Sequence, residues 1–259
     1  MTTRTFQESG TEGVSESIGF LLIFTLMITG IGLVTLYGYP LLVQQQTSAD
    51  EQIMEKNMIV LQNDVKSLAY KTVPYKETSL KIGGGALTVY NSQYTPPAST
   101  ITIRDGSNAI VEDFSSGDLT YRSASTNTEV SLQNGAVVKR QNPGSVMLAE
   151  PRWFYDGETK TMVVNLVNLT SNEIMARDGI GTVQMALGET RFDDHVPLND
   201  IFIDYTYDPD RDYSTAWDNY FRNSLGMTRE PATEPLRTYK FPPTSRLVIK
   251  QYEVIIRSL

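Results

Sequence analysis

The sequence contains no cysteine and only one histidine. It therefore forms no disulfide, no thiolate metal site and no cysteine nucleophile, and one histidine cannot make a typical zinc site. Lysine and arginine are not gathered into a basic run, and 30 acidic against 22 basic residues give a formal net charge of −8. The electrostatic footprint of a nucleic-acid-binding protein is therefore missing, and we expect no nucleic-acid partner.

Charge is also missing from one long segment, because residues 17–49 include no Asp, Glu, Lys, Arg or His. Within it, residues 18–43 form an uninterrupted apolar run of 26 residues. As a helix this run would be roughly 39 Å long, more than the ~30 Å hydrocarbon core of a bilayer. A cleaved secretory signal peptide has an apolar segment of only about 7–15 residues. The sequence therefore predicts a single transmembrane helix over residues 14–43.

Small residues recur along one face of this predicted helix, at Thr25, Thr29, Gly32 and Thr35. Spacings of four and three place them where a second helix could approach closely, so we treat them as candidate subunit contacts. The alternative is that glycine and threonine are simply common in membrane helices. Pro40 lacks a backbone donor and should kink the helix near its outer end.

A second helical pattern follows the apolar run. Met54, Met58, Leu61, Val65 and Leu68 are spaced like the apolar positions of a heptad. We predict an amphipathic stalk helix from Ala49 to about Lys71, within a stalk segment of residues 44–71. Its apolar stripe could pack on the protein's own head or on a neighbouring chain.

Residues 72–259 are expected to form a mainly-β, sandwich-like head outside the membrane. The pattern changes there to alternation with a period of two, which is typical of half-buried strands. The predicted strands lie at residues 86–90, 100–103, 129–132, 162–167, 201–207 and 247–256. Asn134-Gly135 and Asp156-Gly157 predict tight hairpin turns. One helix is expected over Ser214–Leu225, and Gly83-Gly84-Gly85 is interpreted as a flexible joint before a strand.

An acidic cluster is the strongest candidate for a metal site. Asp208, Asp210 and Asp212 alternate like the first ligands of a calcium loop. However, Tyr213 stands where the loop's glycine belongs, and Asn219 stands where its glutamate belongs. The alternative interpretation is a turn whose last aspartate, or Ser214, caps the next helix. Calcium is thus the only cofactor that the sequence puts forward.

No catalytic constellation is visible, so we do not expect an enzyme. Asp193-Asp194-His195 contains the only histidine, and we interpret it as a solvated loop. Asn168-Leu169-Thr170 is the only N-glycosylation sequon, which would agree with an exposed head. Arg4 precedes the apolar run and Asp50, Glu51 and Glu55 follow it, which favours a cytoplasmic N-terminus and an extracellular head.

Residues 13–19, GVSESIG, followed by the apolar run, resemble the start of archaeal type IV pilin-like and archaellin-like proteins. Members of that family typically have a basic residue, a glycine and then Val-Ser-Pro-x-Ile-Gly. Here Glu12 stands at the basic position and Glu16 at the proline position.

The resemblance implies that a prepilin peptidase-like protease cuts between Gly13 and Val14. Residues 1–13 would then be a cytoplasmic leader, and the mature helices would associate with one another or with other pilin-like subunits. Glu16 could meet the terminal amine of a neighbour, as a glutamate near the mature N-terminus of related bacterial pilins is thought to do. The implied function is a subunit, major or minor, of a cell-surface filament. The alternative is a single-pass surface protein that does not polymerise and whose head binds a ligand, an envelope component or a protein.

Overall fold

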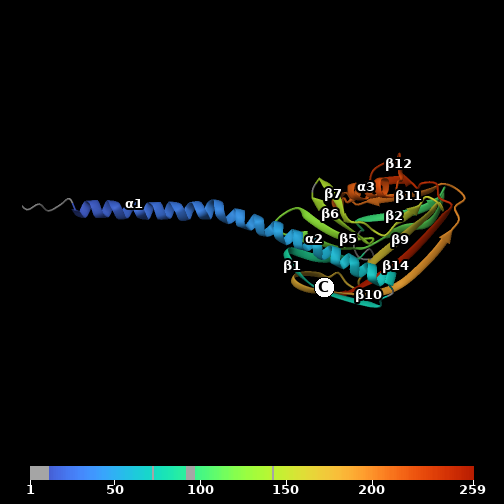
Figure 1. Cartoon of the computed structure of the whole chain (residues 1–259), viewed down its shortest axis with the longest axis horizontal. Helices are drawn as coiled ribbons and strands as arrows, with labels where there is room; N and C mark the ends of the chain where they lie inside the picture. The colour runs from blue at the N-terminus through green and yellow to red at the C-terminus, as the bar shows by residue number, and fades with distance from the viewer. Residues whose placement is uncertain (1–11, 72, 92–96, 142) are drawn as a thin grey trace, which may run out of the picture. The chain divides into compact units, whose positions relative to one another are not determined.

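The structure is a computed structural model that describes residues 12–71, 73–91, 97–141 and 143–259 (Figure 1). Side chains are described from Ser17 onward. The chain divides into two compact units, one ending at Ala49 and the other covering Asp50–Leu259. Each unit is considered by itself below.

Helical elements follow one another without a gap up to Lys71. They are α1 (Glu12–Leu33), the π-helical turn η1 (Val34–Gly38) and α2 (Tyr39–Lys71). In η1 the Tyr39 amide donates to the Val34 carbonyl, five residues back instead of four. Pro40 follows at once, and a proline inside a helix lacks a donor and clashes with the preceding turn. The wider turn accommodates the proline, so the irregularity predicted near Pro40 is confirmed in this form.

Two β-sheets make up most of the second unit, which confirms the expected mainly-β head. The larger sheet has nine strands in the order β7-β6-β5-β4-β1-β10-β14-β9-β8. Their bounds are β1 (Tyr75–Tyr90), β4 (Asp118–Ser123), β5 (Thr128–Gln133), β6 (Ala136–Gln141), β7 (Gly144–Ala149), β8 (Phe154–Asp156), β9 (Thr161–Thr170), β10 (Ala176–His195) and β14 (Arg246–Ser258). Strands β9 and β14 pair in parallel, whereas the other paired neighbours run antiparallel.

The smaller sheet has five strands in the order β12-β13-β11-β2-β3. Their bounds are β2 (Ser99–Asp105), β3 (Asn108–Ser115), β11 (Ile201–Tyr207), β12 (Thr228–Glu230) and β13 (Leu236–Lys240). Between β11 and β12 the chain forms a short 3₁₀ turn η2 (Pro209–Arg211), α3 (Ser214–Asn219) and a π-helical turn η3 (Tyr220–Ser224). The predicted helix over 214–225 is therefore confirmed, with a wider second half.

Two hydrophobic cores hold this unit together. One lies between the two sheets and contains the aromatic side chains of α3 and η3, including Trp217 and Phe221. The other lies between the large sheet and α2 from Met54 on. Strand β14 serves both, because Leu247 and Ile249 are in the first core and Val254 and Ile256 are in the second.

The apolar stripe of α2 packs on the protein's own β-structure. Met54, Met58, Leu61 and Leu68 are fully buried, and Val65 is nearly so. Figure 1 shows this part of α2 lying across the strands of the large sheet. Of the two partners that the sequence left open, the stripe therefore contacts the head.

One tight-turn prediction is confirmed, the other is confirmed only as a hairpin, and the glycine prediction is wrong. Asn134 and Gly135 both have positive φ, 47° and 71°, in the β5–β6 hairpin, as a tight turn with the right twist requires. Strands β8 and β9 do form an antiparallel hairpin, but residues 157–160 connect them and Asp156 pairs with Thr161, so Asp156-Gly157 is not a two-residue turn. Gly83-Gly84-Gly85 lies inside β1 at a break in its register with β10 and is not a joint. A Cβ at Gly85 would lie 2.8 Å from the Tyr121 ring and closer still to the Arg122 carbonyl oxygen, so close strand approach requires glycine there.

Candidate functional site

The apolar side chains of α1 are exposed along its described length. Phe20 is 71% exposed and Leu26 is 73% exposed, and the most apolar window of the helix has a mean hydropathy of 2.3 with none of it buried. A helix that is hydrophobic on all sides is stable only when lipid or other protein surrounds it. It is the one helix in the described part of the chain that is long and apolar enough to span a membrane, which is consistent with membrane anchoring.

The small residues Thr25, Thr29 and Gly32 on α1, and Thr35 on η1, are exposed. The Thr25 hydroxyl donates to the Leu21 carbonyl and the Thr29 hydroxyl to the Thr25 carbonyl, both at 2.7 Å. These bonds satisfy the hydroxyls without water, as an apolar environment requires. A Cβ placed at Gly32 would have no atom within 4 Å. Thr35 lies in η1. The face therefore stays available to another helix.

The residues of the predicted processing site lie at the beginning of α1. Gly13 and Val14 are helical, but the side chains of residues 12–16 lie outside the described residues, and these include Glu16.

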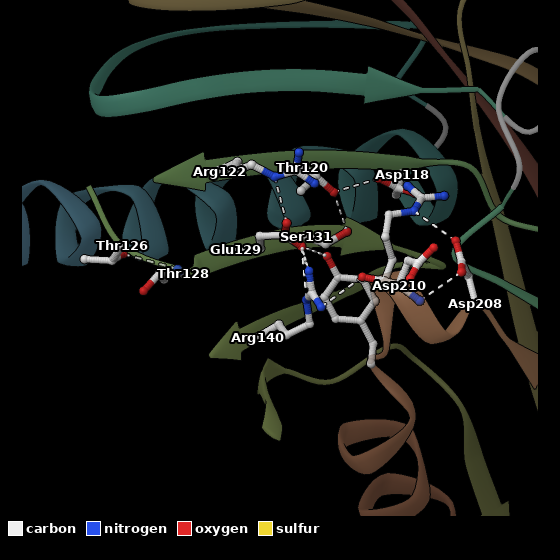
Figure 2. A network of polar contacts seen from close by, with 12 residues as sticks. Asp118, Thr120, Arg122, Thr126, Thr128, Glu129, Ser131, Arg140, Asp208 and Asp210 are labelled. Atoms are coloured by element: carbon white, nitrogen blue, oxygen red, sulfur yellow. Dashed lines mark hydrogen bonds and ion pairs between the residues drawn. The ribbon is translucent and has the colours of Figure 1, made fainter. Parts of the chain in front are cut away.

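Two of the three predicted calcium ligands, Asp208 and Asp212, have carboxylates that are hydrogen-bonded within the segment, and Figure 2 shows Asp208. The Asp208 carboxylate accepts from the Asp210 amide at 3.0 Å, and the Asp212 carboxylate accepts from the Ser214 amide at 2.7 Å. The Asp208 bond caps the 3₁₀ turn η2, whereas α3 has Tyr213 at its N-cap and no side-chain capping bond, so neither Asp212 nor Ser214 caps that helix as the alternative interpretation expected. Within the described ranges no group of three or more His, Asp or Glu side chains is arranged to hold a metal ion. Calcium binding stays a prediction, because the described residues show no arrangement of ligands for a calcium ion.

The same segment is held to the large sheet by a buried ion pair. Arg211 Nη1 lies 3.2 Å from the Asp118 carboxylate, and Arg211 Nε lies 3.7 Å from Asp208. Asp118 is 2% exposed and also accepts from the Thr120 hydroxyl at 2.6 Å. Burial raises the pKa of Asp118 to about 6, because the loss of hydration outweighs the attraction of Arg211.

In a second buried carboxylate, Glu129 on β5, the attraction of nearby cations outweighs the loss of hydration. It accepts from Arg122 at 2.7 Å, from Arg140 at 2.9 Å and from the Tyr213 hydroxyl at 3.1 Å. Burial alone would raise the pKa of Glu129, but the two guanidinium groups together lower it below its usual value. Figure 2 shows Arg122, Glu129 and Arg140 converging from three neighbouring strands. The sequence analysis did not identify Asp118 and Glu129, because an alternating pattern does not show whether an acidic side chain points into the protein or into solvent.

An open groove of about 990 Å³ lies on the large sheet beside the C-terminal end of α2. Its floor is formed by β8, β9, β10 and β14, and Tyr70 of α2 stands at one side. The groove combines aromatic rings with cationic groups; these are Tyr70, Phe154, Phe192, Arg152, Arg246 and Lys250. No sequence pattern indicated this groove, because its residues come from α2, four strands and the connections between them.

Two further predicted positions lie in ordinary surroundings. Asn168 is half-buried on β9, and the hydroxyl of Thr170 in the same sequon donates to Glu253 at 3.2 Å. Glycosylation of Asn168 stays a prediction. The loop interpretation of Asp193-Asp194-His195 is wrong, because these residues are the end of strand β10 and pair with β14. His195 Nε2 lies 3.1 Å from Asp105, whose carboxylate also accepts from the amides of Leu198 and Asn199. The histidine thus helps to fix a loop.

Comparison with known proteins gives one result. A model of a protein family described as a family of unknown function (DUF7289) matches residues 12–257. No curated protein and no solved structure matches the chain. Because the match extends over nearly the whole sequence, the chain belongs to the DUF7289 family of unknown function.

Proposed function

We propose that this protein is a pilin-like subunit of an archaeal cell-surface filament, assembled through the helix of residues 14–43. The observation that carries the proposal is the α1 helix, whose apolar side chains are uncovered by the rest of the described chain. In the membrane, lipid would cover them before assembly. In a filament, the same helices from neighbouring subunits would cover them.

Two features support assembly over simple anchoring. Thr25, Thr29 and Gly32 form a row of small residues that is exposed in the described part of the chain. The family match begins at Glu12, one residue before the junction Gly13-Val14, so the shared region nearly coincides with the mature chain that cleavage would leave.

Cleavage would also create a partner for Glu16. A carboxylate among apolar helices needs a compensating charge. The cut before Val14 releases an amine two residues from Glu16 in sequence, and in an assembly that amine could pair with the Glu16 of a neighbour. This arrangement makes processing a precondition for assembly.

The second candidate is a single-pass surface protein that does not polymerise. The groove on the head favours it, because an anchored protein that does not polymerise would act through a binding surface on its head. The two candidates share the anchor and the extracellular head, and they differ in what happens at Gly13-Val14.

The deciding experiment is the intact mass and N-terminal sequence of the chain from native membranes. A filament subunit should begin at Val14 and should also be recovered in the fraction sheared from cells. Glu16→Ala should reduce recovery in the sheared fraction while leaving the membrane fraction unchanged. Glu8→Ala is the matched control, because the same charge is removed from the discarded leader. A chain that keeps residues 1–13 would refute the filament proposal and leave the plain anchor.

A further inference from the structure

The groove on the large sheet has a regular arrangement of side chains. Arg246, Val248, Lys250 and Tyr252 alternate along β14, so all four point to one face of the sheet, the face that α2 covers further along. In the register of the sheet, Lys250 lies opposite Phe192 of β10, and Arg246 lies opposite Thr161 of β9. From Arg246 to Tyr252 the floor is roughly 20 Å long. It is therefore a platform for an extended ligand.

Two cationic side chains that line the groove, Lys250 and Arg152, have no acidic partner among the described residues. Lys250 and Arg152 form no ion pair within the described residues, although the protein has eight more acidic than basic residues. The Lys250 ammonium lies 5.8 Å from the centre of the Phe192 ring, and the Arg152 guanidinium lies 4.9 Å from the centre of the Tyr70 ring. Lys66 lies in the adjoining hollow with Arg152, and its pKa is lowered first by burial and then by the charge of Arg152. Such a local excess of positive charge attracts an anion.

The remaining walls suit a ligand that is both apolar and rich in hydroxyl groups. Phe154 is 49% exposed and Phe192 is 59% exposed, on opposite sides of the β14 row. Flat exposed rings pack well against the C–H faces of sugar rings. The neutral side chains of Thr161 and Thr190 and the carboxylate of Asp156 also line the groove, and they can exchange hydrogen bonds with hydroxyl groups.

We propose that this groove binds a segment of an acidic polysaccharide, with Arg152 and Lys250 contacting its carboxylates and Phe154 and Phe192 packing on its sugar rings. Single-stranded nucleic acid also combines negative charge with flat rings. It is disfavoured here because Thr161, Thr190 and Asp156 line the groove with groups that exchange hydrogen bonds with sugar hydroxyls, and a phosphodiester chain of the same charge has few free hydroxyl groups. The proposal does not depend on filament formation.

The test is calorimetric titration of the full-length chain in a neutral polyoxyethylene detergent, which brings no sugar headgroup. The probes are oligogalacturonate, its fully methyl-esterified form and an oligothymidylate of equal charge, all at low ionic strength, where exposed charges are least screened. We expect oligogalacturonate to bind and the neutral ester to bind at least about tenfold more weakly, since hydrogen bonds to charged groups are the stronger ones.

Variants locate the binding. Lys250→Met and Arg152→Met should each weaken oligogalacturonate binding about tenfold. Lys81→Met is the matched control, because Lys81 is exposed on β1, forms no ion pair within the described residues and lies outside the groove, and it should bind like the unmodified chain. A variant counts as folded if its thermal unfolding is unchanged. If Lys250→Met is unstable, Arg152→Met alone decides the test, because the Arg152 side chain is exposed.

Three outcomes would overturn the proposal. Oligogalacturonate could fail to bind. The two groove variants could bind as tightly as Lys81→Met, which would place binding elsewhere. Oligothymidylate could bind more tightly than oligogalacturonate, which would make the groove a nucleic-acid site.

Discussion

Arg211 and Asp118 form an ion pair at 3.2 Å that joins the acidic segment between β11 and α3 to strand β4. Asp118 is 2% exposed and has a pKa raised to about 6. The ion pair therefore holds the segment in place, although burial makes ionisation of the Asp118 carboxylate unfavourable. This balance makes the contact sensitive to pH.

The first prediction concerns that pH dependence. Because the folded pKa of Asp118 lies above the unfolded value, the folded state binds more protons between about pH 4 and pH 6. The contribution of Asp118 to stability is therefore fully present below about pH 4 and is lost as the pH rises through 6. A shift of about two units corresponds to about 3 kcal/mol. Asp118→Asn keeps the acceptor for Thr120 and should remove this slope.

The measurement is the free energy of unfolding by denaturant, from pH 4 to pH 7.5, for both chains. Glu129 acts in the opposite sense, since its lowered pKa stabilises the fold above its unfolded pKa, and this stabilisation is lost as the pH falls through the folded pKa. It is present in both chains, so its larger part cancels in their difference; the repulsion between Glu129 and Asp118, which helps to raise the pKa of Asp118, does not cancel. A difference that stays constant with pH would contradict the raised pKa of Asp118.

The second prediction is that Glu129→Gln strongly destabilises the head. Removing the charge leaves Arg140 and Arg122 without their acidic partner, and breaking a buried pair costs about 3–5 kcal/mol. The control is Glu189→Gln, because Glu189 pairs with Arg191 on the surface, where both side chains are more than 60% exposed. That change should stay within about 0.5 kcal/mol. Equal effects would show that the buried network is not a stabilising feature.

The third prediction tests whether the outer part of α2 belongs to the core of the head. Leu61 is fully buried, whereas its neighbour Val60 is 48% exposed. Leu61→Ala should lower the free energy of unfolding by about 2–5 kcal/mol, and Val60→Ala should change it by less than about 0.5 kcal/mol. If both changes were tolerated equally, the stripe would face a partner and not the sheet.

The fourth prediction concerns Gly85 in strand β1. A methyl group there would overlap the Arg122 carbonyl and the Tyr121 ring, so Gly85→Ala should destabilise the head by more than about 2 kcal/mol. Gly144→Ala provides the comparison, because a Cβ at Gly144 meets nothing within 4 Å. Thermal unfolding of the two variants side by side distinguishes a close strand approach from a general intolerance of substitution.

The fifth prediction concerns the helix of the filament proposal. Gly32→Leu should fill the small-residue face and reduce recovery in the sheared fraction several-fold, while the amount in the membrane stays the same. Gly30 lies about 160° away around the helix and is equally uncrowded, so Gly30→Leu is the matched control. Similar losses for both variants would mean that the face at Gly32 has no special role in assembly.

Much of the fold followed from local patterns in the sequence. The charge-free run predicted an apolar helix, because its length exceeds what a soluble core normally buries. The Asn134-Gly135 pair predicted its hairpin, because both positions need positive φ. The stripe from Met54 to Leu68 predicted a helix with one buried face. In each case the cause lies within a few residues, so it can be seen in the chain itself.

Only the tertiary structure decided which parts of the protein these elements pack against. It placed the stripe of α2 on the large sheet, and Gly85 against the neighbouring strand β4. It also paired Asp118 with Arg211 across 93 positions and brought Arg152, Phe192 and Lys250 to one groove. These relationships depend on sheet order and register, which link residues far apart in the chain. The sequence by itself determined an apolar helix and a β-rich head, and the packing of strands far apart in the chain decided where the head has a surface that could bind.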